Sequence, residues 1–326
     1  QAILGSGERN SCWTFASCMR MMSLRLLSKR SERDGVFSFF ARTVLMATSI
    51  ADEVRHAELG DARLNKRLEM LATTLGSNPN HSIPAAADSR ADWEAAYRFF
   101  DNERVSPLKI LKPHYEATLE RVRQCNAVVL AQDTTVIDLT RPKQQVEGAG
   151  RLMTDQQYGV FYHPLMAFTE QSLALGLVWE KHWTREPAAT ELTAKEKARI
   201  RYQTPIEQKE SLRWIEGVRA ARDAAQQCPE TECICVADSE SDVYEVLAEL
   251  VDTSIPNFKL IVRAGQDRTT LEKENWLTTA RNGECLFECS VDVSARHAKF
   301  RSKANYNRQG DRDARVAALE VRACTV

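Results

Sequence analysis

A run of apolar residues that ends on an acid, Asn126-Ala-Val-Val-Leu-Ala-Gln-Asp133-Thr134-Thr135-Val-Ile-Asp138, is the most informative part of the sequence. Its branched apolar residues predict a buried β-strand that delivers a carboxylate and two hydroxyls at its end. Burying an unpaired carboxylate is costly, so packing alone does not explain Asp133.

A second run of the same kind follows about a hundred residues later. Glu232-Cys-Ile-Cys-Val-Ala-Asp238 is again a short apolar segment that ends on an acid, and a helical pattern comes after it. Two such strands can bring two negative charges to one face of a sheet, where a cation relieves their repulsion. Hard oxygen ligands favour Mg²⁺ or Mn²⁺. The alternative for each Asp is a turn residue or a helix N-cap, and it stays open at this point.

Five motifs occur in a fixed order along the chain. They are Leu59-Gly-Asp-Ala-Arg63-Leu-Asn-Lys66-Arg67-Leu68, Ala96-Tyr-Arg-Phe-Phe-Asp-Asn102, Asp133-Thr134-Thr135, Asp238-Ser-Glu-Ser-Asp242 and Ile261-Val-Arg263. Together they resemble the bacterial cut-and-paste transposases of the insertion-sequence-four family. The similarity runs from about Ala51 to the end of the chain.

The resemblance implies a fold and a chemistry. The fold class would be α/β: a small all-α domain that binds transposon-end DNA, then an RNase H-like mixed sheet, then part of a β-rich insertion. Asp133 and Asp238 match the two aspartates of the family's DDE triad, which binds the metal ions that activate the attacking oxygen and stabilise the leaving one. The implied contacts to DNA involve six side chains, those of Arg63, Lys66, Arg67, Thr134, Thr135 and Arg263. The alternative for the three bases at 63–67 is a solvated helix face, and for Thr134 and Thr135 a plain role at the strand end is favoured.

The implied partners are double-stranded DNA, as transposon ends and as target, and a second copy of the complete protein in a homodimer on DNA. The third catalytic residue of the family, a Glu in a Tyr-x-x-Arg-x-x-x-Glu-x-x-x-x-x-x-Lys pattern, has no match. Tyr306 is followed by Gln309 where Arg is required, and no Lys follows Glu320. Glu240 and Asp242 are interpreted as outer or capping residues.

The chain is therefore expected to be a truncated transposase that is inactive as written. One alternative is a catalytically dead DNA-binding remnant that blocks a full-length relative, and another is the inert product of a pseudogene.

Composition and charge restrict the possible functions and cell compartments only a little. The formal net charge of the 326 residues is −1, so no overall basic field indicates nucleic acid. The nine cysteines show no regular pairing pattern, which favours reduced thiols over a disulfide scaffold. Cys285 and Cys289 are interpreted as packing residues rather than as half of a zinc site. No apolar run is long enough to span a membrane, and the predicted location is the bacterial cytoplasm, at the nucleoid.

The sequence suggests four segments. Residues 1–45 are an atypical extension that could be a transit peptide or signal, an accessory DNA-binding arm, or translated non-coding sequence before a true start at Met46; the last interpretation is preferred. Residues 46–105 are the helical DNA-binding domain, 106–268 the catalytic domain and 269–326 the partial insertion.

Periodicity predicts the elements inside these segments. One helix has Leu64, Leu68, Leu71 and Leu75 on its apolar face, a second has Trp93, Tyr97 and Phe100 in the core, and a third begins at Ser106-Pro107. Strands are predicted at 157–165, 173–180 and 259–263, a polar loop at 186–204, and a long helix with Ile206, Leu212, Ile215 and Val218 on one face. Seven basic residues near the C-terminus could track a phosphate backbone or form a solvated loop: Arg296, Lys299, Arg301, Lys303, Arg308, Arg312 and Arg315.

Overall fold

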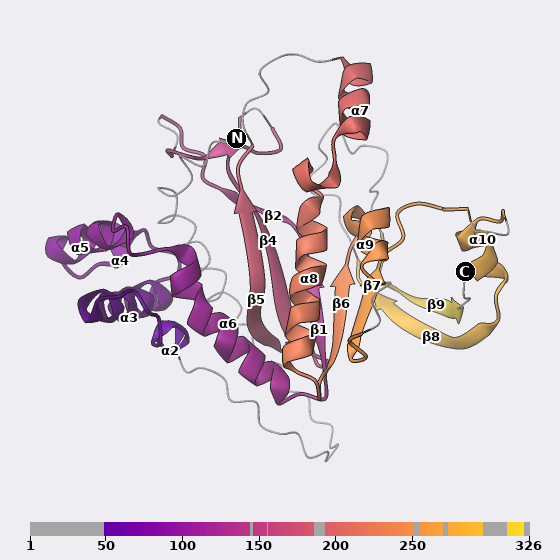
Figure 1. Cartoon of the computed structure of the whole chain (residues 1–326), viewed down its shortest axis with the longest axis horizontal. Helices are drawn as coiled ribbons and strands as arrows, with labels where there is room; N and C mark the ends of the chain where they lie inside the picture. Colours follow the sequence, from indigo (N-terminus) through magenta and orange to yellow (C-terminus); the bar gives the residue numbers. More distant parts are fainter. Residues whose placement is uncertain are drawn as a thin grey trace. The chain divides into compact units, whose positions relative to one another are not determined.

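The computed structural model describes residues 49–143, 146–154, 156–185, 193–250, 254–269, 273–295 and 312–322. It divides into two compact units, the first ending at Arg263 and the second beginning at Ala264. The first unit combines short helices with a mixed sheet that is covered by longer helices (Figure 1). The predicted extension at 1–45 and the predicted start at Met46 lie outside the described residues.

Four helices come first, and their caps and apolar faces explain them. They are α2 (Ile50–Val54), α3 (Ala62–Ser77), α4 (Ile83–Ala86) and α5 (Arg90–Phe100). Ser49 forms a capping box at α2, and the side chains of Asp61 and Ser89 cap α3 and α5. The predicted face of α3 is confirmed, because Leu68, Leu71 and Leu75 are buried and Leu64 packs against the same core.

The predicted aromatic face of α5 is only partly correct. The buried residues of this helix are Ala96, Phe99 and Phe100, whereas Tyr97 is 37% exposed. Positions 96, 99 and 100 share one helical face, and Tyr97 lies to the side of it, where it meets Trp93 edge to face.

Helix α6 (Pro107–Arg123) begins as predicted, with Ser106 as N-cap and proline in the first turn. A buried ion cluster joins it to α2, because Arg121 Nη1 donates to Glu53 Oε1 at 2.9 Å and His114 Nδ1 lies 2.6 Å from Glu53 Oε2. The other ring nitrogen of His114 accepts a hydrogen bond from the backbone N–H of Leu177, at 2.9 Å. The first helices are therefore tied through α6 to a strand of the sheet.

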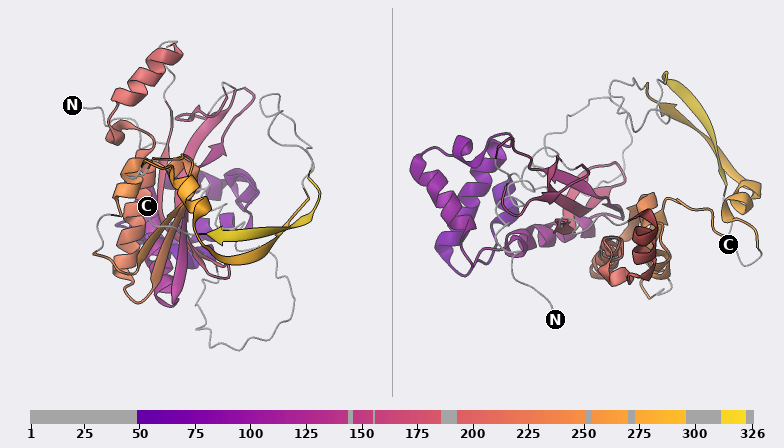
Figure 2. Two further views of the ribbon diagram at one scale, coloured as in Figure 1. Left: turned by 90° about the vertical axis from the view of Figure 1, so that its right-hand side faces the viewer. Right: turned by 90° about the horizontal axis from the view of Figure 1, so that it is seen from above.

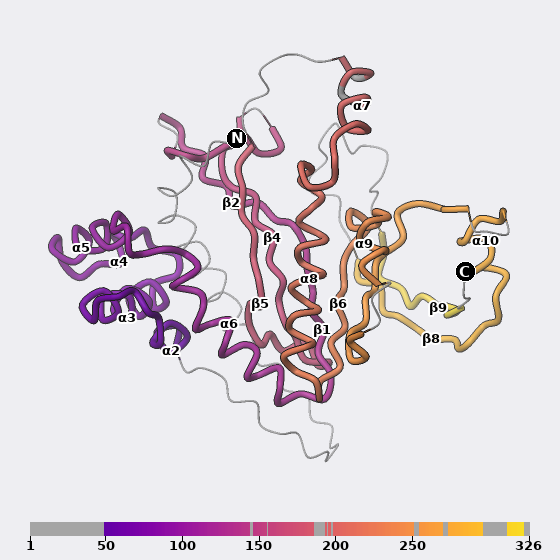
Figure 3. Tube along the Cα trace, viewed as in Figure 1, coloured from indigo at the N-terminus to yellow at the C-terminus, as the bar shows by residue number. Residues whose placement is uncertain are grey.

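The sheet has seven strands. They are β1 (Ala127–Gln132), β2 (Thr135–Asp138), β3 (Gly150–Arg151), β4 (Tyr158–Thr169), β5 (Ala174–Trp183), β6 (Glu232–Ala237) and β7 (Phe258–Val262). The main order is β2-β4-β1-β6-β7, and β3 and β5 also pair with β4. β1 is antiparallel to β4 and parallel to β6, which is parallel to β7. Figure 3 shows β1, β6 and β7 side by side.

Two helices cover one face of this sheet. Helix α8 (Leu212–Gln227) and α6 pack against a core that includes Val128, Leu130, Cys233 and Cys235 (Figure 1). The two thiols are fully buried. Burial raises the pKa of each thiol to about 12, so both stay protonated at neutral pH.

Two predictions between β5 and α8 are wrong. The predicted loop contains helix α7 (Ala194–Gln203), because a Thr193–Glu196 capping box and good helix formers outweigh the missing apolar face. The predicted long helix begins only at Leu212, since Ile206 belongs to the short 3₁₀ helix η2 (Ile206–Gln208) that follows Pro205. After β6 come η3 (Ser239–Ser241) and α9 (Tyr244–Ala248).

The second unit contains α10 (Trp276–Asn282) and a two-stranded antiparallel sheet of β8 (Cys285–Val293) and β9 (Arg315–Arg322). Of the seven predicted basic residues, Arg312 donates to the carbonyl oxygen of Ser294 and Arg315 begins β9. The other five lie outside the described residues: Arg296, Lys299, Arg301, Lys303 and Arg308. Within the described ranges, no helix is long and apolar enough to cross a membrane.

Candidate active site

The register of β1 and β6 brings Asp133 and Asp238 to one edge of the sheet, which is called the carboxylate edge below. The two strands are parallel, and the last paired residues are Ala131 and Val236. Asp133 and Asp238 each follow two residues later, so they occupy equivalent positions just beyond the carboxyl ends of adjacent strands. Adjacent strands lie about 4.8 Å apart, which is close enough for two carboxylates to share a cation.

Both aspartates also have a local role. Asp133 Oδ1 accepts a hydrogen bond from the backbone N–H of Thr134 at 2.7 Å, and Asp238 Oδ1 accepts from the N–H of Glu240 at 2.8 Å. The second bond makes Asp238 the N-cap of η3. The turn and capping alternatives are thus real, but each bond uses only one carboxylate oxygen, and a carboxylate has four acceptor sites.

Three other predicted residues lie at the same edge. Thr134 follows Asp133 directly, and Thr135 begins β2, where it pairs with Tyr162 of β4. Arg263 comes directly after β7, and its N–H donates to the carbonyl oxygen of Ala237, the residue before Asp238. Its side chain is exposed, so this edge of the sheet carries a basic residue on the strand next to β6.

A buried chain of hydrogen bonds fixes the loop that carries Asp133. Arg213 Nε donates to Thr134 Oγ1 at 2.8 Å. Because Gln132 Oε1 can only accept, the neutral His163 ring carries its proton on Nε2, and its Nδ1 accepts from the Thr134 hydroxyl at 2.9 Å. The Nε2 proton points to Gln132 Oε1 at 3.1 Å. Gln132 Nε2 donates in turn to Cys235 Sγ at 3.5 Å.

His163 has a structural part in this chain. It is fully buried and meets the Trp214 ring edge to face at 4.6 Å. Burial, with Arg213 and Lys181 nearby, lowers its pKa to about 3. The ring is therefore neutral at every physiological pH and holds Thr134 and Gln132 in place without titrating.

Arg213 also connects the two acid-bearing loops. Its Nη2 donates to Glu240 Oε2 at 2.8 Å, while its Nε holds Thr134. Burial lowers the pKa of this guanidinium, and the carboxylates of Glu240 and Glu210 oppose that effect. One buried side chain thus bridges the segment after Asp133 and the segment after Asp238.

Close packing of α8 makes this arrangement possible. A Cβ atom added at Gly217 would lie 2.1 Å from Gln132 Oε1, so only glycine lets the helix approach the hydrogen-bonded chain.

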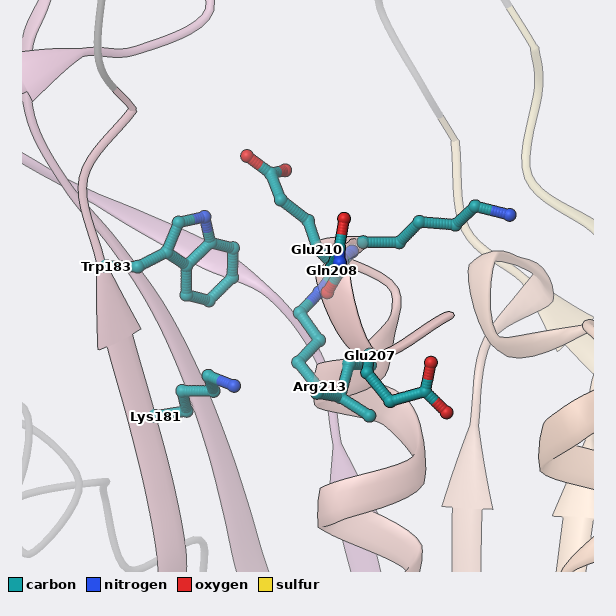
Figure 4. Close-up of a pocket in the computed structure, with 8 residues that line it drawn as sticks. Lys181, Trp183, Glu207, Gln208, Glu210 and Arg213 are labelled. Atoms are coloured by element: carbon teal, nitrogen blue, oxygen red, sulfur yellow. The ribbon is translucent and has the colours of Figure 1, made fainter. Parts of the chain in front are cut away.

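A pocket of about 220 Å³ lies on the other side of Arg213. Figure 4 shows Lys181 and Trp183 of β5 facing Glu207, Glu210 and Arg213, which come from the η2–α8 segment. Lys181 pairs with Glu216 and Glu210 pairs with Arg185, so these two lining charges already have partners. Arg213 lines this pocket and also donates to Thr134, the residue after Asp133.

The carboxylates of Asp133 and Asp238 are ligands of the kind that a hard divalent cation prefers, and Mg²⁺ commonly takes one or two of them together with water. Among the residues that the structure describes, no group of three or more His, Cys, Asp and Glu side chains is arranged to hold a metal ion. Glu240 is engaged by Arg213, and Asp242 is 2% exposed. Cys285 and Cys289 form no such group either.

The predicted bases of α3 lie apart from this edge, in the first helices. Arg63 is exposed and pairs with Asp61 at 3.0 Å, and Lys66 is exposed as well. Arg67 is half-buried and lies 3.6 Å from Asp92 of α5. Arg63 and Lys66 are therefore accessible to DNA phosphates, whereas Arg67 is less accessible because it is half-buried and pairs with Asp92.

Sequence reasoning missed His163 and Arg213. A histidine within the apolar strand 157–165 and an arginine within an apolar helical stripe were the available signals, because polar groups at such positions need buried partners.

Comparison with known proteins bears on the first helices. Residues 46–105 match the family model described as Transposase DNA-binding. This match covers α2 to α5 with the bases of α3, and it has the boundaries predicted for the DNA-binding domain.

The comparisons with curated proteins and with solved structures give less information about this chain. No curated protein matches the chain. A solved structure, the cryo-EM structure of the piggyBac transposase synaptic complex with hairpin DNA, is similar at 9% sequence identity and a TM-score of 0.26. The match covers 88% of this chain and 47% of that one, so the chain spans about half of the solved structure's length. A TM-score this low supports no conclusion about the fold.

Proposed function

We propose that this chain is part of a cut-and-paste DNA transposase of the insertion-sequence-four type. The match of residues 46–105 to transposase DNA-binding domains carries the proposal. The bases of α3 would contact transposon-end DNA, and the mixed sheet would be an RNase H-like catalytic domain. The strand arrangement supports the second point: β5, β4 and β1 are antiparallel neighbours, and β6 and β7 continue the sheet in parallel with β1.

In the proposed mechanism, Asp133 and Asp238 hold Mg²⁺ or Mn²⁺. When bound, the metal would activate the attacking oxygen and stabilise the leaving 3′-oxygen of a phosphodiester. Arg213 and Thr134 keep the two acid-bearing loops together through direct hydrogen bonds, and Arg263 offers a positive charge to the DNA backbone beside them. The homodimer on DNA and the location at the nucleoid belong to the same proposal.

A DNA-binding measurement tests the proposed contact between α3 and transposon-end DNA. Selection from a pool of random-sequence duplexes should enrich a defined sequence, since the first helices would read transposon ends. The double variant Arg63→Ala/Lys66→Ala removes two exposed charges, so the slope of log affinity against log salt concentration should fall by about 1.8. Arg67→Ala should change it less, because Asp92 already holds that side chain. Unchanged binding by the double variant would rule out this face of α3.

A metal-binding measurement tests the proposed catalytic domain without requiring catalytic activity. Mn²⁺ affinity, measured on the whole chain by electron paramagnetic resonance, should fall at least about tenfold in Asp133→Asn and in Asp238→Asn. Asp138→Asn is a matched control, since this acid ends β2 and accepts from the N–H of Thr140. If both edge variants bind Mn²⁺ like the wild type, the carboxylate edge is not the metal site.

Cleavage separates the active enzyme from the alternative of a DNA-binding remnant. Metal-dependent nicking of the selected duplex, lost in Asp133→Asn, would indicate catalysis. A protein that binds the duplex and Mn²⁺ without nicking would fit the remnant, which could block a full-length relative.

A further inference from the structure

Helix α7 has no buried face. Its described side chains, Lys195, Glu196 and those at 198–203, are all exposed, and Tyr202 is 91% exposed. The helix stands clear of the sheet, above the upper end of α8, and the left-hand view in Figure 2 shows the same separation (Figures 1 and 2). A helix of ten residues is marginal in water without tertiary packing, so a partner that packs on α7 would stabilise it.

One side of α7 combines two cations with the aromatic ring. At 3.6 residues per turn, Lys195, Arg199 and Tyr202 fall within an arc of about 60°. The acid in the first turn, Glu196, caps the helix and does not pair with these cations. Its Oε2 accepts hydrogen bonds from the backbone N–H of Thr193, at 2.9 Å, and from the Thr193 hydroxyl. The Lys195–Arg199–Tyr202 face is thus basic and aromatic, as single-stranded or distorted nucleic acid requires.

The chain path puts this face at the catalytic end of the sheet. Helix α7 lies between Trp183, the last residue of β5, and Leu212, the first of α8. Arg213, next to Leu212, contacts Thr134 beside Asp133. The helix therefore leaves the fold at the edge where both aspartates lie, and not near the bases of α3.

We infer that the Lys195–Arg199–Tyr202 face is a second DNA contact, separate from the DNA-binding helices, which holds the strand presented to the carboxylate edge. This inference rests on the proposed function. Lys195 and Arg199 pair with backbone phosphates, and the Tyr202 ring stacks on a base or sugar.

The test uses the whole chain and a fluorescein-labelled duplex of about 40 base pairs with a single-stranded end, titrated at several salt concentrations. Lys195→Ala/Arg199→Ala should lower the salt slope by about 1.8 and weaken binding on the order of tenfold. Tyr202→Ser should weaken binding severalfold and leave the slope unchanged, since stacking releases no counterions. Lys112→Ala/Arg219→Ala removes two exposed cations elsewhere and is the matched control, expected to bind like the wild type.

The outcomes separate this inference from the proposed function. Wild-type slope and affinity in both α7 variants, while Arg63→Ala/Lys66→Ala loses binding, would overturn the α7 contact alone. An equal loss in the control would also overturn it, because the effect would then be one of overall charge. A shift in oligomer mass with unchanged DNA affinity would assign the face to a second copy of the chain instead. No DNA binding by the wild type would overturn both proposals.

Discussion

Arg121→Met is expected to destabilise the first unit by about 3–5 kcal/mol, because it leaves a buried carboxylate without its cation. Arg121 and Glu53 have side chains only 6% and 10% exposed, and two hydrogen bonds join them, at 2.9 and 3.2 Å. Methionine fills a similar volume and carries no charge, so lost pairing rather than an empty cavity dominates the effect. The unfolding midpoint should fall on the order of 10 °C in circular dichroism.

Two comparisons distinguish ion pairing from other causes. Lys112→Met, on the same helix, removes a cation that is 66% exposed, and should cost less than about 1 kcal/mol. Glu53→Met combined with Arg121→Met should be closer to the wild type than Arg121→Met alone, because neither charge is left buried. An Arg121→Met protein as stable as Lys112→Met would contradict the expected role of the cluster.

The pH dependence gives an independent signature. Burial alone would raise the pKa of Glu53, but hydrogen bonds from His114 and Arg121 and the charge of the guanidinium outweigh it and keep this pKa below its ordinary value. A lowered pKa stabilises the fold above the unfolded-state value, and that contribution is lost as pH falls through the folded-state value. Glu53→Gln should therefore show a weaker loss of stability on acidification than the wild type.

The cluster connects the part of the chain that matches a DNA-binding family to the part that carries the carboxylate edge. Glu53 lies on α2, within the matched residues, whereas His114 and Arg121 lie on α6 and contact β5. Separate domains with a free linker would not need a buried ion pair between them. The pairing argues that these helices and the sheet fold as one unit.

Local pattern predicted much of the fold. The apolar runs before Asp133 and Asp238 have the length and branching of buried strands, and their equal ends follow from parallel pairing. Strand β2 was not separated from β1 because Thr135–Asp138 is short and mostly exposed, and thus carries little apolar signal. Helix α7 was missed for the same reason, although its capping box could have been found.

The contacts that organise the candidate site could not be predicted in this way. Arg213 and Thr134 are 79 residues apart in sequence, and His163 and Gln132 are 31 apart. Such pairs depend on how α8 and β4 pack against β1, which periodicity does not report. The sequence shows which residues are polar, but it does not show which residues they contact in the fold.

Gly176→Ala is expected to cost about 3 kcal/mol or more, because it combines backbone strain with a steric clash. Gly176 lies in β5 with φ at 144°, a conformation that residues with a Cβ rarely adopt. The added Cβ would lie 2.2 Å from Thr118 Oγ1 and 3.0 Å from both Arg121 Nη2 and His114 Cε1. These atoms cannot move aside, since they belong to the buried cluster that binds Glu53.

Gly60→Ala separates the two effects. Gly60 also has a positive φ, 76°, but a Cβ there would meet no atom within 4 Å, so this variant reports strain alone, about 1–3 kcal/mol. Adding Thr118→Ala to Gly176→Ala removes the closest clashing atom, and the double variant should lose less stability than the sum of the singles. Additive losses, measured by urea unfolding, would mean that β5 shifts away from α6 instead. The Leu177–His114 hydrogen bond would then break, and faster amide exchange at Leu177 would reveal it.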